Sequence, residues 1–317
     1  IASCLVGSEM CIRDRSRPTL KRTALAVTSA LIAALLPLAA SHAQDSGTLA
    51  KIQQAGAITL GYRESSFGFS YLDGDLKPVG YSMDICRRIV DEVKAQLKLP
   101  ALQVRYQAVT SANRIPLVAN GTVDLECGST TNLVDRQKQV AFSPDIFRYN
   151  VRMLVRADSG LRSVADLQGK TVATTAGTTS FRLLREADRG RNLDITNLSG
   201  KDHSDSFMLV ESGRAQAFVL DDILLAGQIA NAKNPQDYLI TGESLRTENQ
   251  ALMLRKDDAG FKAIVDRVVT GMMQSGEMEK LYNRWFMSPI PPRNININYP
   301  LNAETREAFA HPSSKGI

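Results

Sequence analysis

The chain has 317 residues, which is long enough for two lobes that each have a hydrophobic core. Its hydrophobic content of 44% and charged content of 22% are ordinary for a soluble globular protein. The formal charge of +5 falls to about +2 when residues 1–43, with five basic and two acidic side chains, are set aside. The charge therefore gives no support for nucleic-acid binding, and we expect no nucleic-acid partner.

The first 43 residues are predicted not to belong to the fold. Lys21 and Arg22 precede an apolar run from Ala24 to Ala40, and small residues follow up to Ala43. This order is typical of a secretory signal peptide with cleavage after Ala43, and it places the mature protein in the periplasm. The alternative is a membrane anchor, but the run is short for one and contains a proline. Residues 1–15 resemble translated sequencing-adapter read-through, and no later segment is predicted to span a membrane.

From residue 48 onward, strand and helix patterns alternate, which predicts an α/β fold. In the first part we expect a strand at 57–62, a hairpin-type turn at 71–80, a helix at 82–97, a strand at 102–108, a helix at 111–120 and a strand at 123–127. Ser82 and Ser111 are interpreted as the N-caps of the two helices.

The same order of elements follows in the second part. We expect strands at 170–174, 193–198, 215–220, 238–241 and 251–255, and helices at 181–188, 206–212, 223–232, 258–274 and 277–286. Extended connections around 147–155 and 248–255 would join two lobes. The first lobe would then be discontinuous, with residues 48–148 and 252–290, and the second would comprise 149–251. Residues 291–317 are expected to form a surface tail that is poorly ordered at its end.

The stretch from Gly128 to Arg136 is predicted to bind an anion. It follows an apolar strand, has small and hydroxyl-bearing residues, and ends in an arginine. Backbone N–H groups and hydroxyls would hold one side of a carboxylate, and the guanidinium would grip the other side. Open α/β sheets place ligands beyond the carboxyl ends of their strands, where this stretch would lie. A second hydroxyl-rich loop, 175–180, precedes a helix; it lacks the lysine and the spacing of a phosphate-binding P-loop, so a nucleotide is not expected.

Ten polar residues at predicted strand ends form the candidate ligand site: Arg63, Ser111, Arg114, Ser129, Thr131, Arg136, Thr178, Thr179, His203 and Asp221. Three guanidiniums and an imidazole would supply more positive charge than one carboxylate needs, and one aspartate would hold an ammonium group. The matching ligand is a small dicarboxylic amino acid. Structural roles are the alternatives: a solvated arginine, an exposed loop histidine, and an aspartate that caps the next helix. We expect no metal and no cofactor.

The order of short motifs adds a family resemblance. The motifs are Arg63-Glu-Ser-Ser, Thr110-Ser-Ala-Asn-Arg-Ile-Pro-Leu, Asn120-Gly-Thr, Glu126-Cys-Gly-Ser-Thr-Thr-Asn, Gly177-Thr-Thr-Ser, Lys201-Asp-His-Ser-Asp-Ser-Phe, Glu211-Ser-Gly-Arg-Ala, Leu220-Asp-Asp, Met253-Leu-Arg-Lys-Asp-Asp and Pro289-Ile-Pro-Pro. The chain resembles, over residues 48–299, the periplasmic glutamate/aspartate-binding proteins of ABC importers, within the polar-amino-acid solute-binding proteins. The resemblance implies the type II two-lobed clamshell with two crossover hinge strands.

By this resemblance, each part of an acidic amino acid has its own residues. Arg136, with Ser129, Thr131 and the loop of Thr178 and Thr179, would take the α-carboxylate. Asp221 would take the α-ammonium group. The side-chain carboxylate would meet Arg63, Ser111, Arg114 and His203.

The cysteines of the mature chain are Cys86 and Cys127, and they allow two interpretations. An oxidising periplasm permits a disulfide, whereas buried thiols on a helix and a strand are more often small apolar residues. Relatives can carry a cysteine near 249–251, where this chain has Asn-Gln-Ala, so the partner of Cys127 stays open.

The primary hypothesis is a monomeric periplasmic receptor, not an enzyme. It would close over L-glutamate or L-aspartate by hinge bending and deliver the amino acid to the permease of an ABC importer. The alternative is an enzyme on the same scaffold that resembles cyclohexadienyl dehydratase, with His203 as its acid or base. A third class, a sensor input domain, would need a separate signalling partner.

Overall fold

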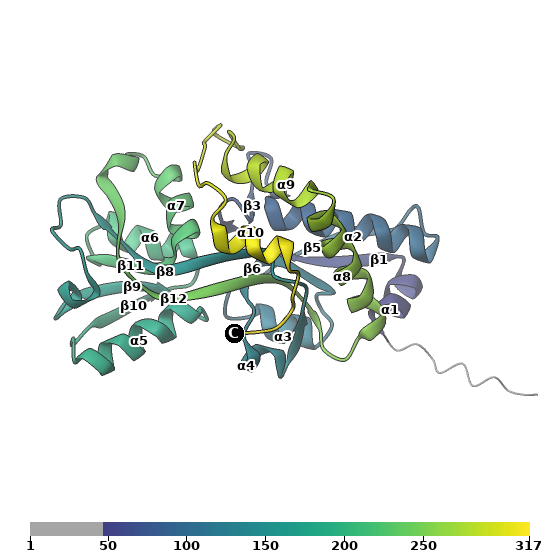
Figure 1. Ribbon diagram of the computed structural model, residues 1–317, viewed down its shortest axis with the longest axis horizontal. Helices are drawn as coiled ribbons and strands as arrows, with labels where there is room; N and C mark the ends of the chain where they lie inside the picture. Colours follow the sequence, from purple (N-terminus) through teal and green to yellow (C-terminus); the bar gives the residue numbers. More distant parts are fainter. Residues whose placement is uncertain (1–46) are drawn as a thin grey trace, which may run out of the picture. The chain divides into compact units, whose positions relative to one another are not determined.

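The computed structural model describes residues 47–317, which belong to one compact unit (Figure 1). The predicted signal peptide and its cleavage site lie outside the described residues. None of the helices within 47–317 has the length and apolarity needed to cross a membrane.

The first lobe is built on three parallel strands. β1 (Ala57–Tyr62) lies between β5 (Gln103–Ala108) and β6 (Leu125–Thr131). Its helices are α1 (Thr48–Ala55), α2 (Tyr81–Leu97), α3 (Arg114–Ala119), α4 (Val134–Gln137), α8 (Ala259–Gln274) and α9 (Glu277–Phe286). β2 (Ser65–Ser66), β3 (Ser70–Leu72) and β4 (Pro78–Val79) form a small antiparallel sheet, which confirms the predicted hairpin.

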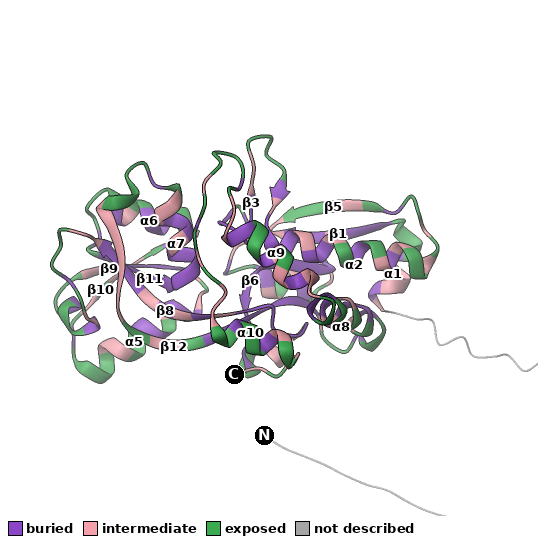
Figure 2. Ribbon diagram, turned by 45° about the horizontal axis from the view of Figure 1, so that its top comes forward, coloured by how far each residue is buried: buried purple, intermediate pink, exposed green. Residues whose placement is uncertain are grey.

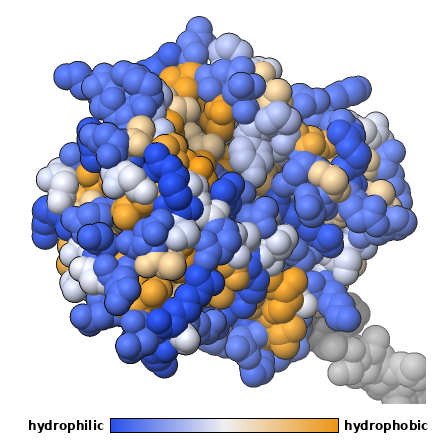
Figure 3. Space-filling view, turned by 60° about the vertical axis from the view of Figure 1, so that its left-hand side comes forward, coloured by the Kyte–Doolittle hydropathy of each residue, from blue (hydrophilic) through white to orange (hydrophobic). Residues whose placement is uncertain are grey.

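The second lobe repeats the arrangement. β9 (Thr171–Thr175) lies between β10 (Thr196–Gly200) and β11 (Ala217–Asp221), and all three strands are parallel. The helices are α5 (Thr179–Arg191), α6 (His203–Glu211) and α7 (Asp222–Asn231), with short 3₁₀ turns at Val164–Leu167 and Pro235–Asp237. Figure 3, in which this lobe faces the reader, shows a mainly hydrophilic surface with separated apolar patches.

Two long strands pass between the lobes. β8 (Phe147–Arg156) and β12 (Tyr238–Arg255) pair antiparallel with each other, and β12 also pairs with β6 and with β7 (Val140–Phe142). Within residues 47–317 they join both sets of strands into one nine-stranded sheet of order β10-β9-β11-β8-β12-β6-β1-β5, with β7 on β12. The proposed lobe boundaries at 148/149 and 251/252 fall inside these strands. Figure 2 shows that β6 and β11 are buried, that the second-lobe half of β12 is partly exposed, and that the outer helix faces are exposed.

A disulfide and aromatic side chains fill the core of the first lobe. Cys86 of α2 is bonded to Cys127 of β6, with a Cα–Cα distance of 6.2 Å. The interpretation of these cysteines as separate apolar residues is therefore wrong. The helix and the strand pack against each other and bring both buried side chains to one point, a placement that sequence spacing does not reveal.

Several local predictions are also wrong. Helix α2 begins at Tyr81 after Gly80, and the Ser82 hydroxyl donates to the Gly128 carbonyl at 2.7 Å instead of capping the helix. Asn113 precedes α3, so Ser111 is not its N-cap. The supposed loop after residue 127 continues β6 to Thr131, because β12 supplies hydrogen-bonding partners as far as that residue.

The C-terminal segment is more ordered than expected. Residues Ala303–Ala310 form helix α10, and the Thr305 hydroxyl accepts a hydrogen bond from the backbone N–H of Arg148 at 3.0 Å. At the end of the chain, the Ile317 N–H donates to the Asn132 carbonyl. The predicted poor order at the end does not hold, because backbone groups of the first lobe fix these residues.

Candidate functional site

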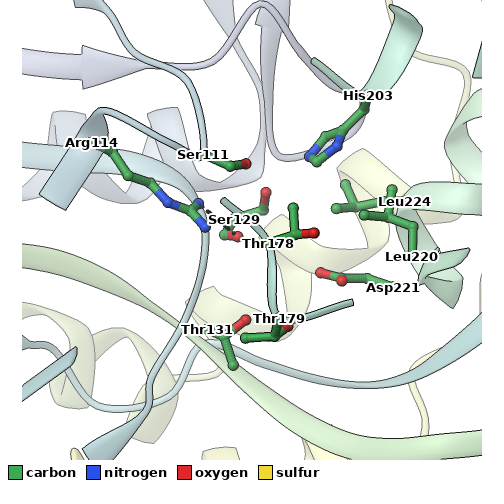
Figure 4. Close-up of a pocket in the computed structure, with 10 residues that line it drawn as sticks. All are labelled: Ser111, Arg114, Ser129, Thr131, Thr178, Thr179, His203, Leu220, Asp221 and Leu224. Atoms are coloured by element: carbon green, nitrogen blue, oxygen red, sulfur yellow. Dashed lines mark hydrogen bonds between the residues drawn. The ribbon is translucent and has the colours of Figure 1, made fainter. Parts of the chain in front are cut away.

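Eight of the ten predicted site residues line one polar pocket (Figure 4). They are Ser111, Arg114, Ser129, Thr131, Thr178, Thr179, His203 and Asp221, joined by Leu220 and Leu224. The pocket has about 210 Å³ of empty space, including space open to solvent. The other two predicted residues, Arg63 and Arg136, do not line the pocket but contact residues that do, His203 and Thr131 respectively.

Arg114 is the principal charged donor of the pocket on the first lobe. It is the first residue of α3, and its Nη1 donates to the Ser129 carbonyl at 3.1 Å. Its Nε and the Ser111 hydroxyl are buried and have no hydrogen-bond partner within residues 47–317. Because buried polar groups are normally hydrogen-bonded, these two atoms mark a place where a ligand oxygen fits.

Arg63 follows β1 directly, and its side chain is fully buried. Burial, with the nearby Arg114, lowers the pKa of Arg63 to about 10, so it stays charged at neutral pH. Its Nη2 lies 3.4 Å from His203 Nε2, while its Nε and Nη1 find no partner among the described residues.

His203 does not add the positive charge that the sequence suggested. A guanidinium only donates hydrogen bonds, so Nε2 accepts from Arg63, and Nδ1 carries the proton toward Thr175 Oγ1 at 3.0 Å. Burial, Arg63 and Arg114 hold the pKa of His203 well below its usual value. The imidazole is therefore neutral.

Glu126 was missed by the sequence argument. Its side chain is fully buried in β6, with Oε1 4.0 Å from Arg114 Nη1 and Oε2 accepting from Thr130 Oγ1 at 2.6 Å. A Cβ at Gly128 would lie 2.2 Å from Glu126 Oε1, so glycine leaves the room for this carboxylate. In the sequence, Glu126 lies between the apolar residues Leu125 and Cys127 and fits the alternation of a half-exposed strand. The sequence therefore gives no sign that this carboxylate is buried.

Arg136 connects the two lobes by hydrogen bonds to a backbone carbonyl of each. It donates to the carbonyl of Thr131 at 2.9 Å and to that of Gly177 at 3.3 Å. Burial and Arg114 lower the pKa of Arg136 to about 10. Gly177 has a φ of +80°, and a Cβ there would lie 2.6 Å from the Ala112 Cα, so the second lobe approaches the first very closely at this point.

The second lobe supplies hydroxyls and one acid. Thr178 is the N-cap of α5, with its hydroxyl accepting from the Phe181 N–H, and Thr179 is the first helical residue. Asp221 occupies the N-cap position of α7 but makes no side-chain cap; its Oδ2 accepts from Gln250 Nε2 at 2.8 Å. Burial and the nearby Glu248 raise the pKa of Asp221 to about 7.

Glu248 of β12 was also missed. It is fully buried and forms an ion pair with Arg246 through Oε1, while Oε2 faces hydroxyls that border the pocket. With Glu126 and Asp221 it brings three carboxylates to this region, against the four guanidiniums of Arg63, Arg114, Arg136 and Arg246. Asp222, next to Asp221, is a further buried carboxylate on the second-lobe side. The pocket has donors on the side of Arg114 and acceptors on the side of Asp221.

Within residues 47–317, no group of three or more His, Cys, Asp or Glu side chains is placed to hold a metal ion.

Comparison with known proteins gives relatives along nearly the whole chain. An L-glutamate/L-aspartate-binding protein of Pseudomonas aeruginosa is 47% identical over 290 residues, which is 91% of this chain and 96% of the relative. A glutamate/aspartate import solute-binding protein of Escherichia coli is 45% identical over 299 residues, 94% of this chain and 99% of the relative. These relatives are named as binding proteins and not as enzymes.

Solved structures show the same fold. A mutant of ArgBP from T. maritima has a TM-score of 0.66 at 26% identity, covering 75% of this chain and 98% of that one. A cysteine-binding protein from Campylobacter jejuni has a TM-score of 0.66 at 24% identity, covering 75% and 92%. The family of bacterial extracellular solute-binding proteins, family 3, matches residues 58–288. The chain therefore belongs to family 3 of the bacterial extracellular solute-binding proteins and has their two-lobed α/β fold.

Proposed function

We propose that this solute-binding protein captures L-glutamate and L-aspartate and delivers them to the membrane permease of an ABC importer. The observation that carries the proposal is the division of the pocket into a side with a charged donor, at Arg114, and a side with an acceptor, at Asp221. The relatives named for glutamate and aspartate support it.

The charge of the pocket fits this ligand class. On the first-lobe side of the pocket, the guanidiniums of Arg63, Arg114 and Arg136 outnumber the one buried carboxylate, Glu126. An acidic amino acid carries two carboxylates and one ammonium group, hence one net negative charge. Its second carboxylate gives these guanidiniums a further anionic partner, whereas the side-chain amide of glutamine brings no charge and arginine adds a positive one.

Each polar group of the ligand has a proposed partner. The side-chain carboxylate would bind Arg114 and the Ser111 hydroxyl, with His203 in the same lining and Arg63 in contact with His203. The α-carboxylate would lie at the N-terminal N–H groups of α5, near Thr178 and Thr179, with Arg136 as its cation. The ammonium group would bind Asp221.

The proposed mechanism is hinge closure. The pocket residues come from two lobes that β8 and β12 connect, so bending of these strands would open the pocket. We propose that closure over the ligand creates the form that the permease recognises. We also propose that residues 1–43 act as a signal peptide cleaved after Ala43, and that the mature protein works in the periplasm as a monomer.

Isothermal titration calorimetry on the mature chain tests the ligand assignment. We expect L-glutamate and L-aspartate to bind with micromolar or tighter affinity, and L-glutamine and L-arginine to bind at least 100-fold more weakly. Binding of both acidic amino acids no tighter than about millimolar would end the proposal.

A further inference from the structure

We propose that Glu248 is the positioning residue that turns the pocket hydroxyls of Thr131 and Thr179 into hydrogen-bond acceptors. The inference rests on the proposed function, because it concerns how the same pocket recognises the ammonium group of an amino acid. It assigns a role to a buried residue that need not contact the ligand.

Glu248 lies where elements of both lobes meet. It belongs to β12, Thr131 ends β6 in the first lobe, and Thr179 begins α5 in the second. One oxygen, Oε1, pairs with Arg246, whose Nε lies 2.9 Å away. The other oxygen, Oε2, faces Thr179 Oγ1 at 2.6 Å, the Tyr149 hydroxyl at 2.7 Å and Thr131 Oγ1 at 3.3 Å.

The position of each hydroxyl proton follows from these contacts. A carboxylate only accepts hydrogen bonds, so Thr179 and Tyr149 must donate their single protons to Glu248. Tyr149 then has no proton left for Thr131 Oγ1, which lies 2.7 Å from it. Thr131 therefore donates to Tyr149 or to Glu248, and in either case its proton points away from the pocket.

Two acceptors thus face the pocket beside Asp221. Thr131 and Thr179 both line it, and with their protons engaged they present only lone pairs to a ligand. In Figure 4 both hydroxyl side chains lie on the same side as Asp221, away from His203. This corner fits a group that donates several hydrogen bonds, which an ammonium group does and a carboxylate does not. The hydroxyls of Thr131 and Thr179 are therefore assigned to the ammonium group and not, as the family resemblance implied, to the α-carboxylate, which keeps the backbone N–H groups of α5 and Arg136.

The same contacts link ligand recognition to closure. The hydrogen bond from Thr179 to Glu248 joins the second lobe to the crossing strand, and the bond from Thr131 joins the first lobe to it. Opening the lobes would separate Thr131 of the first lobe from Thr179 and Glu248 of the second, so the two hydroxyls would no longer face one site. The acceptor corner is therefore complete only in the closed form.

The isosteric change Glu248→Gln tests the role of the carboxylate. An amide can donate to Thr179 and reverse its hydroxyl, which would then point a proton at the ligand's ammonium group. We expect at least a tenfold loss of L-glutamate affinity by calorimetry. Glu243→Gln is the matched control, because Glu243 is an exposed acid on the same strand that pairs with Arg191; its affinity should stay within twofold of wild type.

A double-mutant cycle with Thr179→Val separates positioning from general support of the fold. If Glu248 acts through Thr179, the variant with both changes binds L-glutamate within about threefold of Glu248→Gln alone. The inference would be overturned if the affinity losses of the two single variants multiplied in the double variant, or if Glu248→Gln bound L-glutamate with wild-type affinity. Wild-type protein that fails to bind L-glutamate would instead refute the proposed function.

Thermal unfolding without ligand shows whether each variant folds. If Glu248→Gln does not fold, Glu248→Asp replaces it in the cycle. It keeps a charge beside Arg246 and withdraws the carboxylate from Thr179. The same lack of additivity with Thr179→Val is expected, and multiplied losses again contradict the inference.

Discussion

The two lobes are held together in different ways. In the first, Phe69, Phe147 and Phe286 have ring centroids within about 5 Å of one another, and the Cys86–Cys127 disulfide ties a helix to the sheet. In the second, within the described part of the chain, the one aromatic ring pair is Phe207 with Tyr238, and the rest of the core is mainly aliphatic, with Phe218 buried among these side chains.

The difference matches the charges that each lobe contributes. The guanidiniums of Arg63, Arg114 and Arg136 come from the first lobe, whereas the second brings Thr178, Thr179, Asp221 and a neutral His203. Burial and the repulsion of neighbouring like charges both disfavour a buried guanidinium, and burial, with the nearby Arg114, lowers the pKa of Arg63, so such groups need a scaffold that cannot relax. The comparison suggests that the cross-linked lobe holds the cations and the other lobe closes on the ligand they bind.

The largest expected effect comes from removing the cross-link. The disulfide closes a loop with a sequence separation of 41 residues, so the double change Cys86→Ser and Cys127→Ser should lower the free energy of unfolding by about 4 kcal/mol. Urea denaturation measures it. Wild type under reducing conditions serves as the control and should behave like the double variant.

The difference between the lobes also predicts which lobe loses stability when the disulfide is removed. If the lobes unfold in separate steps, the transition of the first lobe should shift and that of the second should stay. Equal shifts of both, or an unchanged midpoint, would contradict a difference in rigidity between them.

Arg114→Ala should have the next largest effect. It removes the guanidinium that lines the pocket and leaves a ligand carboxylate buried without a cation, at a cost of about 3 kcal/mol or roughly a 150-fold loss of L-glutamate affinity. Arg114→Lys keeps the charge without the planar fork and should lose less. Calorimetry measures both.

The matched control is Arg105→Ala, which removes an exposed arginine from β5 of the same lobe. Its affinity for L-glutamate should equal that of wild type. Equal losses in the two alanine variants would mean that the net charge of the lobe, and not the position of Arg114, governs binding.

Residue patterns predicted the order of elements and most of the pocket, for a physical reason. Apolar periodicity marks strands and helices, and strand ends of one sheet meet at one edge, so Arg114 and Asp221 could be placed together. The partners of buried charges could not be predicted this way. Glu126 and Glu248 lie inside strands and acquire their roles from residues distant in sequence, as does the pairing of Cys86 with Cys127. The charge of His203 likewise depends on its contact with Arg63.

The smallest predicted effect is a pH dependence that originates in the second lobe. Burial raises the pKa of Asp221 to about 7 in the unliganded protein, and an ammonium group pairs with its carboxylate but not with its protonated form. Binding therefore releases a proton when Asp221 starts protonated, so affinity rises with pH through 7 and then levels off. L-Glutamate should bind about tenfold more weakly at pH 6 than at pH 8.

Two variants locate the group responsible for this dependence. Asp221→Asn should bind more weakly at pH 8 and show a flat profile from pH 6 to pH 8. Asp145→Asn should keep the wild-type profile: burial raises the pKa of Asp145 to about 6, but this carboxylate bonds Asn132 and Asn249 and does not line the pocket. His203 stays neutral throughout this range, because its pKa lies well below its usual value. A wild-type profile in Asp221→Asn would therefore assign the titration to another group and contradict the role given to Asp221 in binding the ammonium group.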